Sequence, residues 1–339
     1  MNAPEFYSLS RNKVLLDIRS PGEYAAGHIP GAVSFPLFTD EERAVIGKLY
    51  KQQGHDFAVK KGLSFVAPKM VSFITKAEHL SADKELYLYC WRGGMRSSSM
   101  EWLLSTAGFQ VTRLEGGYKA YREIMRNEFL KDYKYLTLSG NTGSGKTAIL
   151  QELDSMGQQV LDLEGLADHY GSAFGDIHSG VQPSTEHFNN LVHEKLDTLD
   201  PNKPIWVEDE SKHIGKVWLD EGLFNAIKKA PMVIVRKSFE ERVTWLCKLY
   251  GKGDHESLKE GFLKIQKRLG PQNAKIAIEA IEAEDLASAA RIALEYYDKS
   301  YESLLSKRID TKVGELDGRG LNHREVAEKL IEEASNYGG

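Results

Sequence analysis

The sequence has few cysteines, no long apolar run and no excess of positive charge. Two cysteines, Cys90 and Cys247, in 339 residues are too few for a disulfide framework or a tetrahedral metal site, which indicates a reducing compartment and single thiols. No apolar run approaches the roughly 18 residues of a membrane-spanning helix, and the first residues lack the apolar centre of a secretory signal. We therefore expect no membrane partner and a cytoplasmic location.

The charge balance is slightly acidic. Lysine and arginine number 44 against 49 aspartates and glutamates, a formal net charge of −5. Such a chain has no global attraction to nucleic acid, so an RNA substrate would need a local basic surface. Composition alone neither demands nor excludes RNA.

The pattern along the chain predicts two α/β domains, residues 1–130 and residues 131–339. In the first third, short apolar runs alternate with turn signals and helix-like segments, as strands alternating with helices require. Residues 39–82 have helical spacing and predict a helical insertion. From about Phe239 onward the pattern predicts helix almost throughout. Buried parallel strands of the second domain are predicted within residues 135–140, 158–165, 204–211 and 231–238.

Cys90 ends an apolar run, ELYLYC, and is followed by WRGGMRSSS. A strand end places the thiol on a loop whose backbone N–H groups can converge on it, and the following helix N-terminus adds positive potential. Arg92 and Arg96 should favour the thiolate, the attacking form, and would equally stabilise a persulfide or perselenide. The alternative is a buried cysteine beside a tight turn.

The other thiol has different neighbours. Cys247 lies in VTWLCKLYG, a helix-like segment in which apolar residues surround it. Buried cysteines commonly act as small apolar residues. We therefore interpret Cys247 as a small core residue.

The N-terminal part resembles rhodanese domains. Its segment DIRSPGEYAAGHIPGA matches their opening signature, and Cys90 falls where their persulfide cysteine lies. Gly31 permits a tight turn and Asp17 can pair with an arginine, so these residues have supporting roles. The loop from Cys90 to Arg96 is one residue longer than the usual sulfurtransferase loop and has the CX5R spacing of related dual-specificity phosphatases. The matching residues are Asp17, Arg19, Glu23, Tyr24, Gly27, His28, Ile29, Pro30, Gly31 and Ala32.

A phosphate-binding loop is predicted in GNTGSGKT, which follows the strand-like YLTLSG and precedes a helix-like segment. Glycines let the backbone wrap around phosphate oxygens, and the helix N-terminus favours negative charge. Lys146 adds a point charge, and Thr147 could hold a magnesium ion. The candidate phosphate-binding residues are Gly140, Gly143, Ser144, Gly145, Lys146 and Thr147.

Acidic residues at the end of the predicted strand IWVEDES could bind a metal ion or position a water molecule. Because side chains alternate along a strand, Glu208 and Glu210 should share a side while Asp209 points away. A salt-bridged strand end near Lys212 is the alternative. The glycine-bearing segment with His169 and Ser172 could line the same site or form a plain loop.

Taken together, CWRGGMRS in a rhodanese-like domain, GNTGSGKT, LEGLADHYGSAFG and WVEDESKHIG resemble the tRNA 2-selenouridine synthases. The resemblance implies an N-terminal rhodanese-like domain, a parallel sheet flanked by helices, and a C-terminal P-loop NTPase-like α/β domain with a helical tail. It also implies that selenium replaces sulfur at C2 of wobble 2-thiouridine in tRNAs for lysine, glutamate and glutamine.

The substrates and partners follow from the same resemblance. The implied donors are selenophosphate and geranyl diphosphate, the latter making an S-geranyl intermediate whose thiol leaves more readily. The P-loop would grip the diphosphate, with Mg²⁺ helping its departure. An enzyme that produces selenophosphate would be a partner, because it would supply the selenium donor.

Three other functions fit parts of the sequence. A CX5R phosphatase or arsenate reductase would use Cys90 on phosphate or arsenate, but would leave the P-loop domain unexplained. A P-loop kinase with a regulatory rhodanese module would need ATP turnover. A sulfur or selenium carrier would need only Cys90 and a docking partner.

Overall fold

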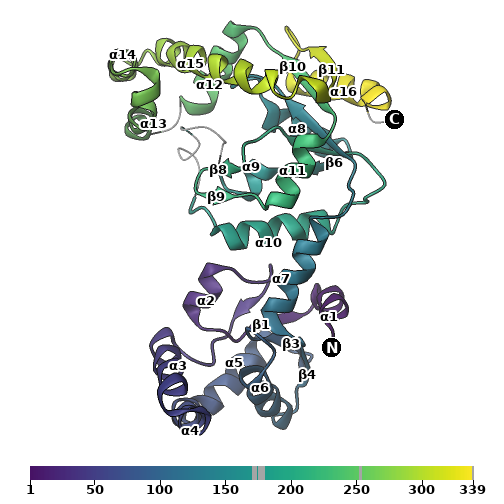
Figure 1. Cartoon of the computed structure of the whole chain (residues 1–339), viewed down its shortest axis with the longest axis vertical. Helices are drawn as coiled ribbons and strands as arrows, with labels where there is room; N and C mark the ends of the chain where they lie inside the picture. Colours follow the sequence, from purple (N-terminus) through teal and green to yellow (C-terminus); the bar gives the residue numbers. More distant parts are fainter. Residues whose placement is uncertain (170–173, 175–179, 252–253, 338–339) are drawn as a thin grey trace. The chain divides into compact units, whose positions relative to one another are not determined.

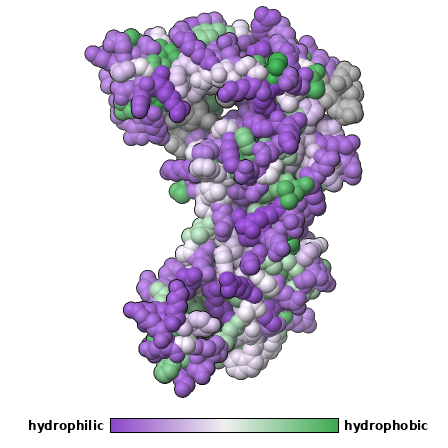
Figure 2. Space-filling model, viewed as in Figure 1, coloured by the Kyte–Doolittle hydropathy of each residue, from purple (hydrophilic) through white to green (hydrophobic). Residues whose placement is uncertain are grey.

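The computed structural model describes residues 1–169, 174, 180–251 and 254–337. Contacts divide the chain into two compact units, Met1–Glu128 and Phe129–Gly339. Within the described part, no helix combines the length and apolar character that crossing a membrane requires. The face of the molecule in Figure 2 is mainly hydrophilic, with apolar residues scattered over it.

The first unit is built on a parallel sheet with the strand order β2-β1-β3-β4 (Figure 1). Short strands and intervening helices confirm the predicted alternation. The strand β2 has only two residues, Val33–Ser34. The elements of this unit are α1 (Ala3–Ser10), β1 (Val14–Asp17), α2 (Pro21–Ala26), β2 (Val33–Ser34), α3 (Asp40–Gln53), α4 (His55–Val66), η1 (Ala67–Lys69), α5 (Met70–Leu80), β3 (Glu85–Tyr89), α6 (Met95–Thr106), β4 (Gln110–Arg113) and α7 (Gly117–Glu128).

Both faces of this sheet are covered, which explains its nearly continuous apolar strands. Leu86 and Leu88 of β3 pack with α5 and α6 on one face. Tyr87 and Tyr89 point to the other face and pack with α1 and α7, because successive side chains of a strand alternate. The loop after β3 therefore leaves the sheet between two packed layers.

The predicted helical insertion is confirmed as α3, α4 and α5. Its first helix begins at a capping box, where Thr39 Oγ1 accepts from Glu42 N (3.2 Å) and Thr39 N donates to Glu42 Oε2 (2.9 Å). These two bonds satisfy N–H groups that the first helical turn would leave unpaired.

The second unit contains a parallel sheet with the order β11-β10-β5-β7-β6 (Figure 1). All four strands predicted from the sequence are present. The elements are β5 (Tyr135–Ser139), α8 (Lys146–Ser155), β6 (Gln159–Leu161), α9 (Leu163–Leu166), α10 (Thr185–Leu196), β7 (Ile205–Glu208), β8 (His213–Ile214), β9 (Val217–Trp218), α11 (Glu221–Lys229), β10 (Met232–Arg236), α12 (Phe239–Tyr250), α13 (His255–Leu269), α14 (Pro271–Glu282), α15 (Leu286–Ser306), η3 (Ile309–Thr311), β11 (Lys312–Asp317) and α16 (His323–Tyr337).

The expectation of helix almost throughout after Phe239 was wrong at one place. Residues Lys312–Asp317 form β11, which pairs in parallel with β10 at the sheet edge. Only Leu316 of this strand is buried, so the segment lacks the continuous apolar run that marks a buried parallel strand. Leu316 joins α8 and α16 in the main core of this unit.

The helices α12 to α15 gather around a separate apolar cluster (Figure 1). Its members include Phe262 from α13, Ala277 from α14 and Ala293 from α15. This cluster is distinct from the core under the sheet, where α8 and α16 pack together. The C-terminal unit therefore carries a helical subdomain beside its parallel sheet.

Candidate functional site

Cys90 directly follows β3, at the carboxyl end of the parallel sheet. This is the edge at which ligands bind in open α/β sheets. Its side chain is 3% exposed, and its Sγ lies 3.3 Å from Ser97 Oγ. Ser97, on α6, was not singled out from the sequence, where it is one of three consecutive serines.

The loop that carries Cys90 is braced by the start of α7. Tyr118 N donates to Cys90 O (2.8 Å) and Lys119 N to Trp91 O (3.1 Å). A Cβ on Gly117 would lie 2.3 Å from Cys90 O and 2.5 Å from Gly93 N, so a side chain there would displace the loop. The approach of two backbone segments thus fixes the position of the thiol.

A buried polar network supports the strand ends beneath this loop. Arg19 and Asp17 form a fully buried ion pair at 2.5 Å, which confirms the expected pairing of Asp17 with an arginine. Tyr89 OH donates to Asp17 Oδ2 (2.9 Å), and the Arg19 guanidinium lies 3.9 Å from the centre of the Tyr118 ring. Gly31 has φ +76°, the tight-turn conformation expected for it.

The two predicted arginines have different surroundings. Arg92 is exposed, whereas Arg96 Nη1 donates to Glu23 Oε2 at 2.8 Å. Burial would raise the pKa of Glu23, but the hydrogen bond and charge of Arg96 outweigh it and lower this pKa. The positive charge of Arg96 is therefore shared with a carboxylate from the rhodanese-like signature.

A large cleft opens over Cys90, with α3 and α4 forming its opposite wall. Its volume is about 1020 Å³. The wall is apolar, with Phe38, Ile46 and Leu63, and the rim is basic, with Arg43 and Lys48. Apolar contact area beside positive charge suits a base together with its phosphate backbone.

Trp91 lies at the edge of this cleft and is partly packed and partly exposed. Its ring packs 5.8 Å from that of Tyr118, yet 37% of the residue is exposed. A partly supported, partly exposed indole offers a face on which a base could stack.

The P-loop of the second unit connects β5 to α8, the context expected for this motif. Gly143 and Gly145 both have φ +79°, a left-handed conformation that favours glycine. Lys146 Nζ donates to Gly140 O across the loop (3.2 Å). The hydroxyl of Ser144 is buried and has no hydrogen-bond partner among the described residues, so it is available to an oxygen of a bound ligand.

Carboxylates gather beside this loop. Thr147 Oγ1 donates to Glu164 Oε2 (2.6 Å), and Leu163 N donates to Glu208 Oε2 (3.1 Å). Burial, with the charges of Asp162 and Glu164, raises the pKa of Glu208 well above its usual range. Burial, with the adjacent Glu164, raises the pKa of Glu210 to about 8.

Glu164 was not among the sequence candidates, although it hydrogen-bonds both to Thr147 and to Glu210. It lies in α9, a helix of four residues, and no spacing rule links it to the phosphate loop. Among the described residues, no group of three or more histidine, cysteine, aspartate or glutamate side chains has the arrangement of a metal site.

Asp209 points away from the glutamates, toward positive charge. It accepts from Ser139 Oγ (2.8 Å) and pairs with Lys228 (2.6 Å) and Arg308. Burial alone would raise the pKa of Asp209, but these two cations outweigh it and lower this pKa. Lys212 instead lies 3.7 Å from Glu221, so it does not form the salt-bridged strand end considered as the alternative.

The remaining candidates are His169, Ser172 and Cys247, of which His169 N donates to Glu164 O (3.1 Å). His169 is buried and packs against the β8–β9 turn, where a Cβ on Gly215 would lie 2.6 Å from its Cδ2. Ser172 lies outside the described residues. Cys247 is in a helix, as predicted, but it is half-buried on a pocket wall rather than enclosed in the core.

These features define a class of protein in which a rhodanese-like domain with a thiol loop is joined to a P-loop domain. Residues 2–124 match the rhodanese-like domain, and residues 133–317 match the tRNA 2-selenouridine synthase AAA domain. The chain belongs to the tRNA 2-selenouridine synthase family.

Relatives of that name match nearly the whole chain. The protein from Sulfurovum sp. (strain NBC37-1) is 37% identical, with 88% of this chain and 87% of the relative covered. The one from Psychromonas ingrahamii is 33% identical, covering 87% and 89%. Among solved structures, an N-terminal domain from Clostridium difficile 630 is 40% identical, covers 37% of this chain and 96% of its own, and has a TM-score of 0.34.

Proposed function

We propose that this protein is a tRNA-modifying enzyme that forms 2-selenouridine from wobble 2-thiouridine, using selenophosphate and passing through an S-geranyl intermediate. The observation that carries the proposal is the family match, which spans both domains. The substrates would be tRNAs for lysine, glutamate and glutamine in the cytoplasm, and selenophosphate would come from a partner enzyme that makes it.

In the first step, the sulfur on C2 would attack C1 of geranyl diphosphate. An S–C bond forms while the C–O bond to diphosphate breaks, diphosphate leaves with its negative charge, and N3 of the base loses its proton. The phosphate loop supports this role because Lys146, the backbone N–H groups and the α8 N-terminus all favour an anion.

Mg²⁺ would complement that loop. Thr147 and Glu164 offer the hard oxygen ligands that Mg²⁺ prefers, beside the place of the phosphates. When bound, the ion would neutralise charge that develops on the leaving diphosphate.

In the second step, the selenium of selenophosphate would form a bond to C2, and the C2–S bond would break as the geranyl thiolate leaves. Water would then cleave the P–Se bond and release phosphate. An alkylated sulfur departs as a thiolate that takes up a proton to become a neutral thiol, whereas an unmodified sulfur would depart as a less stable anion. Cys90 would direct the selenium, with Ser97 as its hydrogen-bond partner and Arg92 and Arg96 as nearby positive charges. The cleft between Cys90 and α3–α4 would receive the base.

The deciding experiment is mass spectrometry of nucleosides from 2-thiouridine tRNA incubated with purified protein, selenophosphate and geranyl diphosphate. Wild type should produce 2-selenouridine, and Cys90→Ala should not. Lys146→Ala should lose geranylation, and full geranylation by this variant would refute the role given to the P-loop. Unchanged tRNA with wild type would favour CX5R phosphatase or carrier chemistry.

A further inference from the structure

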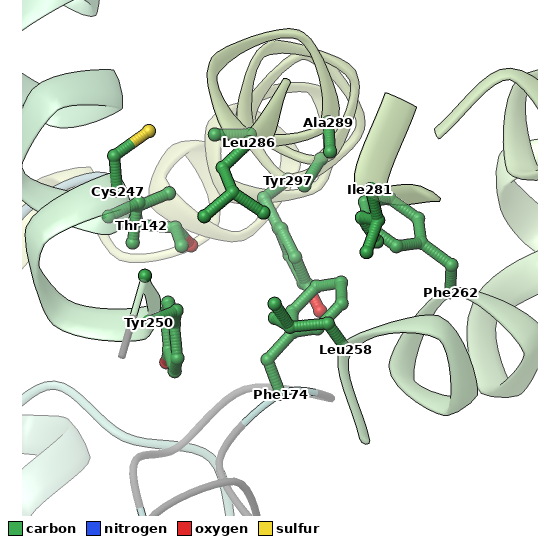
Figure 3. Close-up of a pocket in the computed structure, with 14 residues that line it drawn as sticks. Thr142, Phe174, Cys247, Tyr250, Leu258, Phe262, Ile281, Leu286, Ala289 and Tyr297 are labelled. Carbon is green, nitrogen blue, oxygen red and sulfur yellow. The ribbon is translucent and has the colours of Figure 1, made fainter. Parts of the chain in front are cut away.

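The apolar pocket between α12 and α15 is too small to bind a substrate. Phe174, Tyr250 and Leu258 line its interior in Figure 3, and its volume is about 60 Å³. Ligand pockets of proteins typically enclose ~300–1,000 Å³. Recognition of a large substrate by this unit therefore does not rest on this cavity.

The hairpin of β8 and β9 presents two aromatic rings to solvent. Its strands pair His213 with Trp218 and Ile214 with Val217. Ile214 and Val217 are fully buried, whereas Trp218 is 50% exposed and His213 is exposed as well. The two exposed rings lie against each other, with their centres 3.7 Å apart. One face of the hairpin therefore anchors it in the unit, and the other offers a flat aromatic surface.

Two side-chain amides fix the backbone of this hairpin. Gln182 Nε2 donates to Ile214 O (3.2 Å), and Lys216 N donates to Gln182 Oε1 (2.8 Å). Asn189, which is buried, donates from Nδ2 to Trp218 O (2.9 Å). Because the backbone is held while the Trp218 ring stays exposed, the ring is already positioned for a ligand, which lowers the entropic cost of binding.

The hairpin lies close to the phosphate loop. β8 begins at His213, shortly after Glu210, whose carboxyl group interacts with Lys146 of the loop. Both follow the carboxyl end of β7, the edge at which ligands bind in open α/β sheets. Figure 1 shows β8 and β9 beside α9, the helix whose Glu164 accepts from Thr147 Oγ1 at 2.6 Å. A substrate that contacts the hairpin would therefore have its neighbouring atoms near the phosphate loop.

The charge of the hairpin differs from that of the whole chain. Residues 211–218, SKHIGKVW, carry two lysines and no carboxylate, in a protein with a formal net charge of −5. Lys212 is partly offset by Glu221, 3.7 Å away, and Lys216 is exposed at the turn. Positive charge beside an exposed ring suits RNA, whose phosphates bind lysine while its unpaired bases stack on aromatic rings. An apolar protein surface would instead bury the lysines without partners, which costs free energy.

We propose that the β8–β9 hairpin binds the anticodon loop of the tRNA, with Trp218 stacked on an unpaired base and Lys212 and Lys216 on adjacent phosphates. The inference rests on the proposed function, in which tRNA is the substrate, and adds the surface that receives it in the P-loop unit. Stacking tolerates every base, so the hairpin holds the loop rather than selecting its sequence. Its place beside the phosphate loop brings the wobble base toward the bound diphosphate.

Fluorescence anisotropy of a labelled anticodon stem-loop RNA, titrated with the full-length protein, tests this surface. Trp218→Ala and Trp218→Leu should each weaken binding about fivefold or more, the loss of one stacked base. Trp218→Phe keeps a flat ring and should stay within about threefold of wild type. Trp102→Ala is the matched control, since Trp102 is 62% exposed on α6, outside the hairpin.

The salt dependence of binding separates the lysines from the ring. Lys216→Ala should lower the slope of log K against log salt by about 0.7–1, because one phosphate contact is lost, whereas Trp218→Ala should leave the slope unchanged. In geranylation assays Trp218→Ala should raise the KM for tRNA by the factor by which it weakens binding, with kcat within about threefold of wild type. Its affinity for inorganic pyrophosphate should stay within about twofold, because the phosphate loop is untouched.

The outcomes distinguish this inference from the proposed function. If wild type modifies 2-thiouridine tRNA while Trp218→Ala and Lys216→Ala bind the RNA as it does, the hairpin assignment is wrong and the proposed function stands. If the variants lose RNA binding but wild type modifies no tRNA, the surface stands and the chemistry is wrong. Binding by Trp218→Leu at the wild-type level would overturn stacking. Should Trp218→Ala fail to fold, the comparison of Trp218→Phe with Trp218→Leu decides.

Discussion

The contact between Cys90 and Ser97 gives the thiol a partner that can donate to its anionic form. The two atoms are 3.3 Å apart, and Ser97 Oγ donates its single proton to Gly94 O (2.9 Å). When the thiol ionises, rotation of this hydroxyl can turn the proton to Sγ instead. A hydroxyl donor stabilises a thiolate, and the thiolate is the reactive form of cysteine. Ser97 is therefore expected to control the reactivity of Cys90.

Ser97→Ala should slow alkylation of Cys90 by iodoacetamide about 3- to 10-fold at neutral pH, because one hydrogen bond to an ionised group is lost. Ser98→Ala is a close control, since Ser98 Oγ also donates to Gly94 O (3.0 Å) but faces solvent. Rates are measured by mass spectrometry of the Cys90 peptide. Equal rates for the two variants would exclude this role for Ser97.

The protonated Glu210 makes the phosphate site sensitive to pH. The pKa of Glu210 is raised to about 8 by burial and by Glu164, so the folded protein holds a proton there that the unfolded chain releases near pH 4.5. Above the folded pKa the carboxyl ionises, and a new negative charge then faces Lys146. Stability falls as pH rises between these two values, because the folded state binds more protons.

We expect wild-type affinity for inorganic pyrophosphate to fall as pH rises through about 8, and Glu210→Gln to remove most of that fall. The same variant should gain stability relative to wild type from pH 6 to pH 8.5, by a Tm difference of about 3–6 °C. Titration calorimetry and thermal melts at each pH provide the measurements. Glu295→Gln, at an exposed position of α15, is the control, and an unchanged pH profile for Glu210→Gln would contradict the prediction.

Among the elements, β11 and α16 complete the core on which the phosphate loop is mounted. Leu316 of β11 packs in the same cluster as Leu150 of α8 and Leu330 of α16, and α8 begins directly at the loop. Loss of the packing of Leu316 should therefore destabilise the whole unit, although β11 lies at the sheet edge.

Leu316→Ala should lower the free energy of unfolding by about 2–4 kcal/mol, the cost of a cavity in a packed core. Val313→Ala in the same strand should change it by less than about 0.5 kcal/mol, because Val313 is 44% exposed. Urea denaturation followed by circular dichroism compares them. Similar losses for both variants would mean that burial of Leu316 is not what holds β11.

These elements also show how much of the fold and the site can be predicted from the sequence. The strands with continuous apolar runs and the P-loop were predictable, because burial and glycine spacing leave strong local patterns. β11 was not, since only one of its side chains is buried. Glu164 and Ser97 were not either, because tertiary contacts, rather than a sequence interval, bring them to Thr147 and Cys90.

For the whole molecule, the proposed chemistry divides one modification between two domains of different character. The phosphate loop would serve only the transfer of the geranyl group, and Cys90 only the entry of selenium. The two functions can therefore be separated by supplying the intermediate from outside.

A full-length Lys146→Ala protein should fail on 2-thiouridine tRNA but should convert tRNA that already carries S-geranyl-2-thiouridine into 2-selenouridine, at a rate within about threefold of wild type, because its cysteine loop is untouched. Cys90→Ala should show the opposite behaviour, accumulating the S-geranyl nucleoside and failing on the pre-geranylated tRNA. Nucleoside mass spectrometry over time distinguishes the two. If Lys146→Ala fails on both substrates while it remains folded, the P-loop has a part in the selenium step as well, and the division of labour between the domains is wrong.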